Sequence, residues 1–169
     1  MTPPTLTGHA RPRIAPSLEL AALGEALGVT HSRVLVELYA HGLRAGTAVV
    51  LEWVPAVDVC WLDGADAGER NALRVQLAAD DRATVDGLAL LDAWLTTRPT
   101  PEFFEAGRLA IRVRLHALDD EAREATLDRI VAICEAAGRA GGGQFSVGPL
   151  SKKERRHIDR IRQDLAQPG

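Results

Sequence analysis

The residues best suited to chemistry lie in one short acidic segment, Trp61-Leu-Asp-Gly-Ala-Asp-Ala-Gly-Glu69. Three carboxylates, those of Asp63, Asp66 and Glu69, fall within seven residues of the chain. Carboxylate oxygens are the ligands that Ca²⁺ and Mg²⁺ prefer in proteins. The segment is therefore a candidate site for a divalent cation, although it lacks the twelve-residue loop and the terminal Glu of an EF-hand.

The same residues also have a purely structural interpretation. Asp63-Gly64 is a typical helix stop, and Asp66 with Glu69 three positions later matches the spacing of a capping box that opens a second helix. A glutamate in the first turn is also favoured by the helix dipole. On spacing alone, capping is the stronger interpretation, and metal binding by Asp63, Asp66 and Glu69 is the functional hypothesis.

A glycine-rich segment, Gly138–Gly148, has a spacing that resembles a phosphate-binding loop. Gly143 and Gly148 are separated as in a P-loop, but Pro149-Leu150 stands where Lys and Ser or Thr are required. The segment also follows an expected helix, whereas a P-loop follows a strand. The sequence therefore favours a connection between two helices over a nucleotide site.

The last expected helix is strongly basic, with only Glu154, Asp159 and Asp164 opposing its positive charges. A basic helix can follow a phosphate backbone. No aromatic residues are interleaved to stack on bases, so a solvated helix face is the favoured interpretation and nucleic-acid binding is the lesser alternative. The basic residues are Lys152, Lys153, Arg155, Arg156, Arg160 and Arg162.

Motifs of known catalytic sites are missing from the sequence. It contains no GxSxG, HExxH or GxGxxG motif, and its five histidines are scattered. Cys60 and Cys134 occupy apolar stretches without metal-ligand spacing, which favours buried reduced thiols, with one disulfide as the alternative. The sequence predicts a protein that is not an enzyme and has no catalytic residues or obligatory cofactor.

Length, composition and net charge limit the classes of protein to which this chain can belong. The chain has 169 residues, of which 46% are hydrophobic, and 20 basic against 23 acidic residues give a net charge of −3. This is enough for one globular domain and provides no overall cationic field. Apolar runs are far shorter than the ~20 residues that span a bilayer, and Met1-Thr-Pro-Pro does not begin a secretory signal. We expect a cytoplasmic protein that does not span the membrane.

Hydrophobic periodicity predicts an all-α protein. Residues 1–16 are rich in proline and predict a flexible tail, and residues 17–169 predict a single compact bundle of seven or eight helices. Thr47–Trp53 is rich in β-branched residues and could form a strand. Leu109–Leu115 alternates with a period of two, but its flanks favour a helix over the whole of 102–118.

Two parts of the chain repeat a pattern, which predicts two weakly related helical hairpins packed together. In Val54–Leu77 and again in Ile130–Leu165, an apolar helix ends in a Gly-containing loop. The next helix then begins with Asp or Ser followed by Glu at the third position. The inward stripes of the expected helices predict a core that includes Trp61, Leu73, Leu91, Leu95, Leu127, Ile130, Val131 and Ile161.

These motifs resemble the signature of TerB-like proteins, the tellurite-resistance TerB superfamily. Leu51–Arg70 carries the similarity most clearly: an apolar helix ends in Leu-Asp-Gly, with Leu62 in place of the usual Ala, and Asp-x-x-Glu opens the next helix. Cys134–Gly138 and Ser151–Glu154 resemble the second half-motif. Leu91–Pro99 is similar to a further segment of these proteins.

The resemblance implies an all-helical cytoplasmic module with pseudo-twofold halves and no established catalytic activity. Related domains are linked to tellurite and stress responses, and are thought to bind metal ions or to couple membrane-associated partners to cytoplasmic ones. The family's acidic motif falls on Asp63, Asp66 and Glu69. Ser151 and Glu154 hold the equivalent places in the second half, but Ala137-Gly138 replaces its Asp-Gly.

Three functional hypotheses follow. The first is a non-enzymatic TerB-like binding or scaffold module that meets a protein partner and binds a divalent cation weakly. The second is a small metal-dependent hydrolase that uses the same carboxylates to activate water. The third is nucleic-acid binding through the basic C-terminal helix. A deep pocket beside Asp63 with a converging His or Cys would favour the hydrolase.

Overall fold

The computed structural model describes residues 16–141 and 148–168, and within these residues all regular secondary structure is helical. This confirms the predicted all-α class and the number of helices. The elements are α1 (Pro16–Leu27), α2 (Ser32–Ala40), the 3₁₀ helix η1 (Ala45–Trp53), α3 (Val54–Cys60), α4 (Ala67–Ala78), α5 (Val85–Thr96), α6 (Pro101–His116), α7 (Asp120–Ala140) and α8 (Lys152–Ala166).

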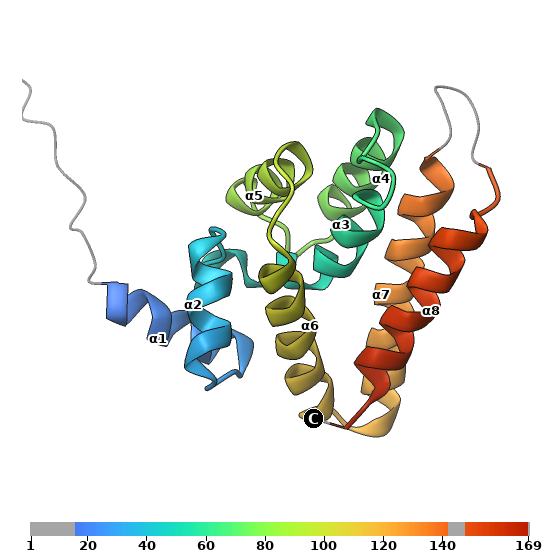
Figure 1. The fold of residues 1–169 in the computed structure, drawn as a ribbon. Coiled ribbons are helices and arrows are strands. Elements are labelled where there is room, and N and C mark those ends of the chain that lie inside the picture. Colours follow the sequence, from blue (N-terminus) through green and yellow to red (C-terminus); the bar gives the residue numbers. More distant parts are fainter. Residues whose placement is uncertain (1–15, 142–147, 169) are drawn as a thin grey trace, which may run out of the picture.

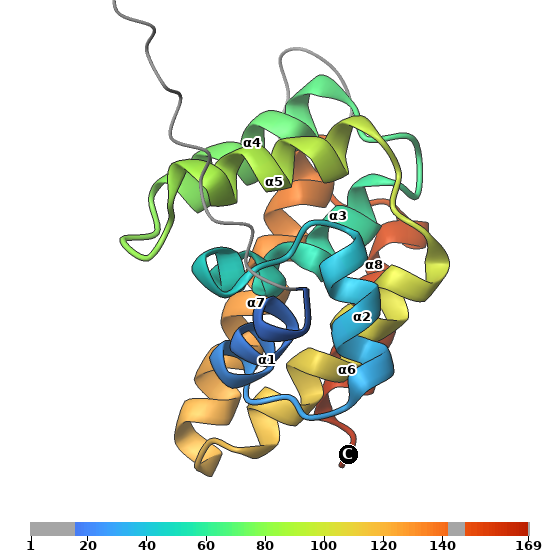
Figure 2. The same cartoon turned by 90° about the vertical axis from the view of Figure 1, so that its left-hand side faces the viewer.

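The 21-residue helix α7 is the centre of the packing. It contacts α3, α4, α6, α8 and η1, and it runs antiparallel beside α8 (Figure 1). Helices α4 and α5 lie together across one end of the molecule (Figure 2), whereas α1 and α2 pack on the side opposite α8. One apolar core connects all of these elements.

The two segments that could have been strands are both helical. Leu109–Leu115 lies inside α6, as its flanks predicted. The strand interpretation of Thr47–Trp53 was wrong, because this segment is the 3₁₀ helix η1 and continues directly into α3. Burial explains the composition: Val50 and Leu51 are fully enclosed by neighbouring helices, so the apolar, β-branched residues serve the core and not a sheet.

The predicted core is confirmed except at Trp61. Leu73, Leu91, Leu95, Leu127, Ile130, Val131 and Ile161 are buried, but Trp61 is only half-buried at the edge of the core. Its indole N–H donates a hydrogen bond to the Trp94 carbonyl at 2.9 Å. A tryptophan that must satisfy its N–H at a helix end is easily left at the core boundary.

Three further expectations concern the N-terminal tail, the two cysteines and membrane-spanning helices. Residues 1–15 of the predicted tail lie outside the described residues, and Pro16 begins α1. Cys60 and Cys134 are both buried free thiols, as favoured. Among the described residues no single helix is long and apolar enough to cross a membrane; only the pair Ser32–Ala40 with Ala45–Cys60, bent by 89°, reaches that length and composition together.

Truncation of Ile130 tests the assigned core face of α7. Ile130 is fully buried, so Ile130→Ala should lower the free energy of unfolding by about 2–5 kcal/mol, measured by urea denaturation. Val75→Ala on the exposed face of α4 is the control and should change stability by less than about 0.5 kcal/mol. An equally small loss for Ile130→Ala would contradict the assignment.

Candidate functional site: an acidic cavity between two helix starts

Helices α4 and α8 begin in the same way, each with a reciprocal capping box. In α4 the Asp66 carboxylate accepts a hydrogen bond from the Glu69 N–H at 2.9 Å, and the Asp66 N–H donates to Glu69 Oε2 at 2.8 Å. In α8 the Ser151 hydroxyl accepts from the Glu154 N–H at 3.1 Å, and the Ser151 N–H donates to Glu154 Oε2 at 2.7 Å. The structure thus confirms both predicted capping boxes.

Both capping glutamates are buried against the last turn of α7. Glu69 is 4% exposed and Glu154 is 8% exposed. Glycines make this room: a Cβ at Gly141 would lie 3.0 Å from Glu69 Oε1, and a Cβ at Gly138 would lie 3.3 Å from Glu154 Oε1. The end of α7 therefore brings the starts of α4 and α8 together.

A cavity of about 310 Å³ lies between these helix ends. It brings together all three residues that the sequence predicted as metal ligands, namely Asp63, Asp66 and Glu69. It adds Glu154 from α8, so four carboxylates from two parts of the chain share one site. The lining residues are Asp63, Asp66, Glu69, Gly141, Pro149, Ser151 and Glu154.

Asp63 enters the cavity from the loop between α3 and α4. The loop turns sharply, because Gly64 and Ala65 both have positive φ angles, of 109° and 50°. The Asp63 carboxylate is exposed and accepts a hydrogen bond from Lys153 Nζ at 2.6 Å, and the same Nζ donates to the Leu62 carbonyl at 2.9 Å. Lys153 therefore compensates part of the negative charge and ties the loop to α8.

The carboxylates share the cavity without forming a ligand cage. Within residues 16–141 and 148–168, no three His, Cys, Asp or Glu side chains are placed so that they could hold a metal ion together. One oxygen of Glu69 and one of Glu154 already accept backbone hydrogen bonds, and Asp63 pairs with Lys153. Cation binding would require Asp63 to leave Lys153 and the other carboxylates to turn inward.

Burial in this acidic cavity raises the pKa of Glu69 from the usual 4.5 to about 7. The main cause is the loss of water around the carboxylate, and the nearby charges of Asp66, Glu154 and Asp63 add to it. The hydrogen bond from the Asp66 N–H acts in the opposite direction. Glu69 is therefore a buried acid that exchanges its proton near neutral pH.

Sequence analysis placed Ser151 and Glu154 in equivalent positions but did not include Glu154 among the site residues. The repeated capping box was the signal that could have identified it, because two similar helix starts in packed hairpins bring their third residues close together. The thiols of Cys60 and Cys134 take no part in the cavity lining. Burial raises the pKa of both thiols, which keeps them protonated.

Comparisons with protein-family models, with curated proteins and with solved structures found no match to this chain. The resemblance to TerB-like proteins therefore stays a prediction from the sequence motifs.

Gly68 tests the close approach that forms the site. A Cβ at Gly68 would lie closer than van der Waals contact to the Ala140 carbonyl oxygen at the end of α7, so the backbone would have to shift. Gly68→Ala should lower the free energy of unfolding by about 1–3 kcal/mol, although alanine normally favours a helix. Gly46→Ala, where nothing lies within 4 Å, is the control for urea denaturation. Equal stability of the two variants would contradict this packing.

The pKa of Glu69 predicts how stability depends on pH. The unfolded chain releases this proton near pH 4.5, whereas the folded chain retains it up to about pH 7. The folded state therefore binds more protons between these values and loses stability as the pH rises through them.

Glu69→Gln should remove this loss, because glutamine keeps the capping hydrogen bonds but carries no charge. We expect its melting temperature to exceed that of the parent protein at pH 8 and the difference to shrink toward pH 5. The exposed Glu25→Gln on α1 is the control. A parallel pH dependence in Glu69→Gln and the parent protein would refute the assignment.

Proposed function

We propose that the protein is a non-enzymatic, TerB-like helical module that acts as a binding or scaffold domain in a tellurite- or stress-response system. The observation that carries this proposal is the cavity itself, where the two capping boxes gather Asp63, Asp66, Glu69 and Glu154. In this proposal the cavity binds a divalent cation weakly, and the cation joins the α3–α4 loop to the start of α8.

The lining of the cavity supports a binding role over the hydrolase alternative. A hydrolytic metal centre keeps an open position for water, and a converging His or Cys would have favoured one here. None of the described residues that line this cavity is a His or a Cys. Of the other titratable groups, His157 is hydrogen-bonded to Asp58 at 3.0 Å in a separate network with Arg108.

The charges around the acidic cavity determine the affinity that we expect for a divalent cation. Four carboxylates in one cavity repel each other, and a divalent cation would relieve this repulsion. The helix starts of α4 and α8 carry positive partial charge and Lys153 already neutralises Asp63, so both oppose a cation. We therefore expect a dissociation constant no tighter than ~10⁻⁵ M, as in weak oxygen-ligand sites.

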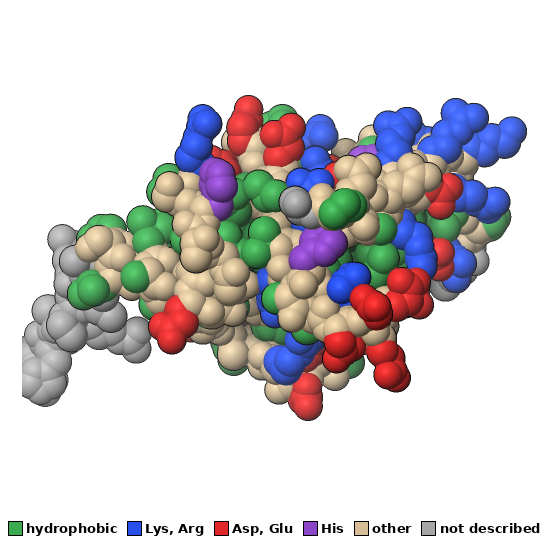
Figure 3. Space-filling model, turned by 90° about the horizontal axis from the view of Figure 1, so that it is seen from below, with side chains coloured by type: hydrophobic (Ala, Val, Ile, Leu, Met, Phe, Trp, Pro, Cys, Tyr) green, Lys and Arg blue, Asp and Glu red, His purple; other side chains and the backbone are tan. Residues whose placement is uncertain are grey.

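The surface suggests where a protein partner would bind. Lys and Arg side chains gather at the end of the molecule where α8 lies, and Asp and Glu side chains gather nearby on a different part of the same view (Figure 3). The exposed basic residues of α8 are Lys152, Lys153, Arg155, Arg156 and Arg160. Such a separation of charge favours an acidic partner on the α8 face.

Thermal denaturation with added cations tests the proposed cation site. At pH 7.5, millimolar Ca²⁺, Mg²⁺ or Mn²⁺ should raise the melting temperature of the parent protein, because a ligand that binds only the folded state stabilises it. The double variant Asp63→Asn, Asp66→Asn should lose this response. Asp66→Asn alone separates ligation from capping, since Asn caps a helix nearly as well as Asp.

Two outcomes would contradict the cation site. One is the absence of both binding heat in calorimetry and a shift in melting temperature for all three ions. The other is an undiminished shift in the double variant. Asp92→Asn on α5, far from the lining residues in sequence and partly exposed, is the control for a general effect of removing a carboxylate.

A further inference from the structure

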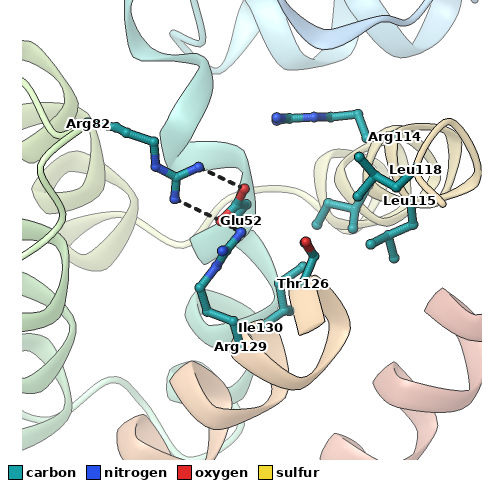
Figure 4. Close-up of a pocket in the computed structure, with 9 residues that line it drawn as sticks. Glu52, Arg82, Arg114, Leu115, Leu118, Thr126, Arg129 and Ile130 are labelled. Atoms are coloured by element: carbon teal, nitrogen blue, oxygen red, sulfur yellow. Dashed lines mark hydrogen bonds and ion pairs between the residues drawn. The ribbon is translucent and has the colours of Figure 1, made fainter. Parts of the chain in front are cut away.

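A second cavity, of about 210 Å³, lies between η1, α6 and α7 and has the opposite charge character. Figure 4 shows arginines from different parts of the chain around it, with Arg82 and Arg129 on either side of Glu52 and Arg114 extending from α6. The remaining wall is aliphatic except for Thr126. The aliphatic residues are Ile111, Leu115, Leu118 and Ile130.

Two of the three arginines are already neutralised by carboxylates. Glu52 is 5% exposed and accepts hydrogen bonds from Arg82 at 3.2 and 3.3 Å and from Arg129 at 2.9 Å. Asp80 also accepts from Arg82, at 2.7 Å. Two guanidinium groups and two carboxylates therefore form one compensated network on this side of the cavity.

Arg114 is the arginine that remains uncompensated. In the described part of the chain it forms no ion pair, and its Nη1 atom is buried without a hydrogen-bond partner. A buried donor without an acceptor costs free energy, and more so when it is charged. A negatively charged acceptor that entered the cavity would satisfy Arg114 and balance its single positive charge.

We propose that this cavity binds a small monoanionic carboxylate with an apolar body. The carboxylate pairs with the Arg114 guanidinium, and the apolar body packs against Ile111, Leu115, Leu118 and Ile130. The geometry points to one negative charge because Glu52 and Asp80 already occupy Arg82 and Arg129. The site is distinct from the acidic cavity at the starts of α4 and α8.

The size and the wall of the cavity define the ligand class. Its volume is below the about 300–1,000 Å³ of pockets for drug-sized ligands. A short-chain carboxylic acid is therefore a suitable size. Inorganic phosphate or sulfate would leave the aliphatic wall without a partner, and a neutral alcohol of the same length would leave the Arg114 charge without a counter-charge.

Calorimetry of the full chain with hexanoate tests this site. We expect hexanoate to bind, and hexanol, hexylamine and inorganic phosphate to bind at least tenfold more weakly or not at all. Arg114→Met should weaken hexanoate binding by about 10- to 100-fold, as expected for the loss of a charge-assisted hydrogen bond. Arg155→Met, which removes an exposed positive charge from α8, should leave binding unchanged.

A second variant tests the apolar half of the site independently. Leu118 is 37% exposed, so Leu118→Ser should retain the fold, as checked by circular dichroism, while it weakens hexanoate binding severalfold. The proposal is overturned if hexanoate does not bind the parent protein or binds Arg114→Met equally well. It is also overturned if hexanol or phosphate binds as tightly as hexanoate.

Discussion

The capping boxes at the starts of α4 and α8 impose the constraint on which much of this structure depends. The first N–H groups of a helix have no partner within the helix and need acceptors from elsewhere. Glu69 and Glu154 supply two of the missing acceptors through their capping boxes. Both glutamates are buried beside the last turn of α7. The acidic cavity therefore results from the way in which the starts of the two helices are capped.

Helix α7 connects two cavities of opposite character. Its first half contributes Thr126, Arg129 and Ile130 to the cavity around Glu52, and Gly141 beyond its last residue lines the acidic cavity. In the first cavity a buried carboxylate is stabilised by guanidinium groups. In the second, burial removes water from Glu69 and other carboxylates lie nearby, which is why its pKa rises, and the hydrogen bond from the Asp66 N–H opposes this rise.

The two helix starts are alike, but the loops that precede them are not. In the first hairpin, Asp63-Gly64 follows α3 and brings a third carboxylate to the cavity. In the second, Gly138 lies within α7, where its missing side chain leaves room for Glu154. The missing side chain at Gly138 therefore has a packing role beside the start of α8.

The sequence by itself determined the features that depend on neighbours within one helical turn. Both capping boxes and most of the core followed from spacing and periodicity, because these signals act between residues three or four apart. The helical state of Leu109–Leu115 followed from its flanks, against its own period of two. Thr47–Trp53 was misjudged because burial, and not strand propensity, selected its β-branched residues. Only the tertiary structure decided that Lys153 pairs with Asp63, and that Arg82 and Arg129, 30 and 77 residues away, neutralise Glu52. Such pairs depend on how whole helices pack, and no local pattern encodes that packing.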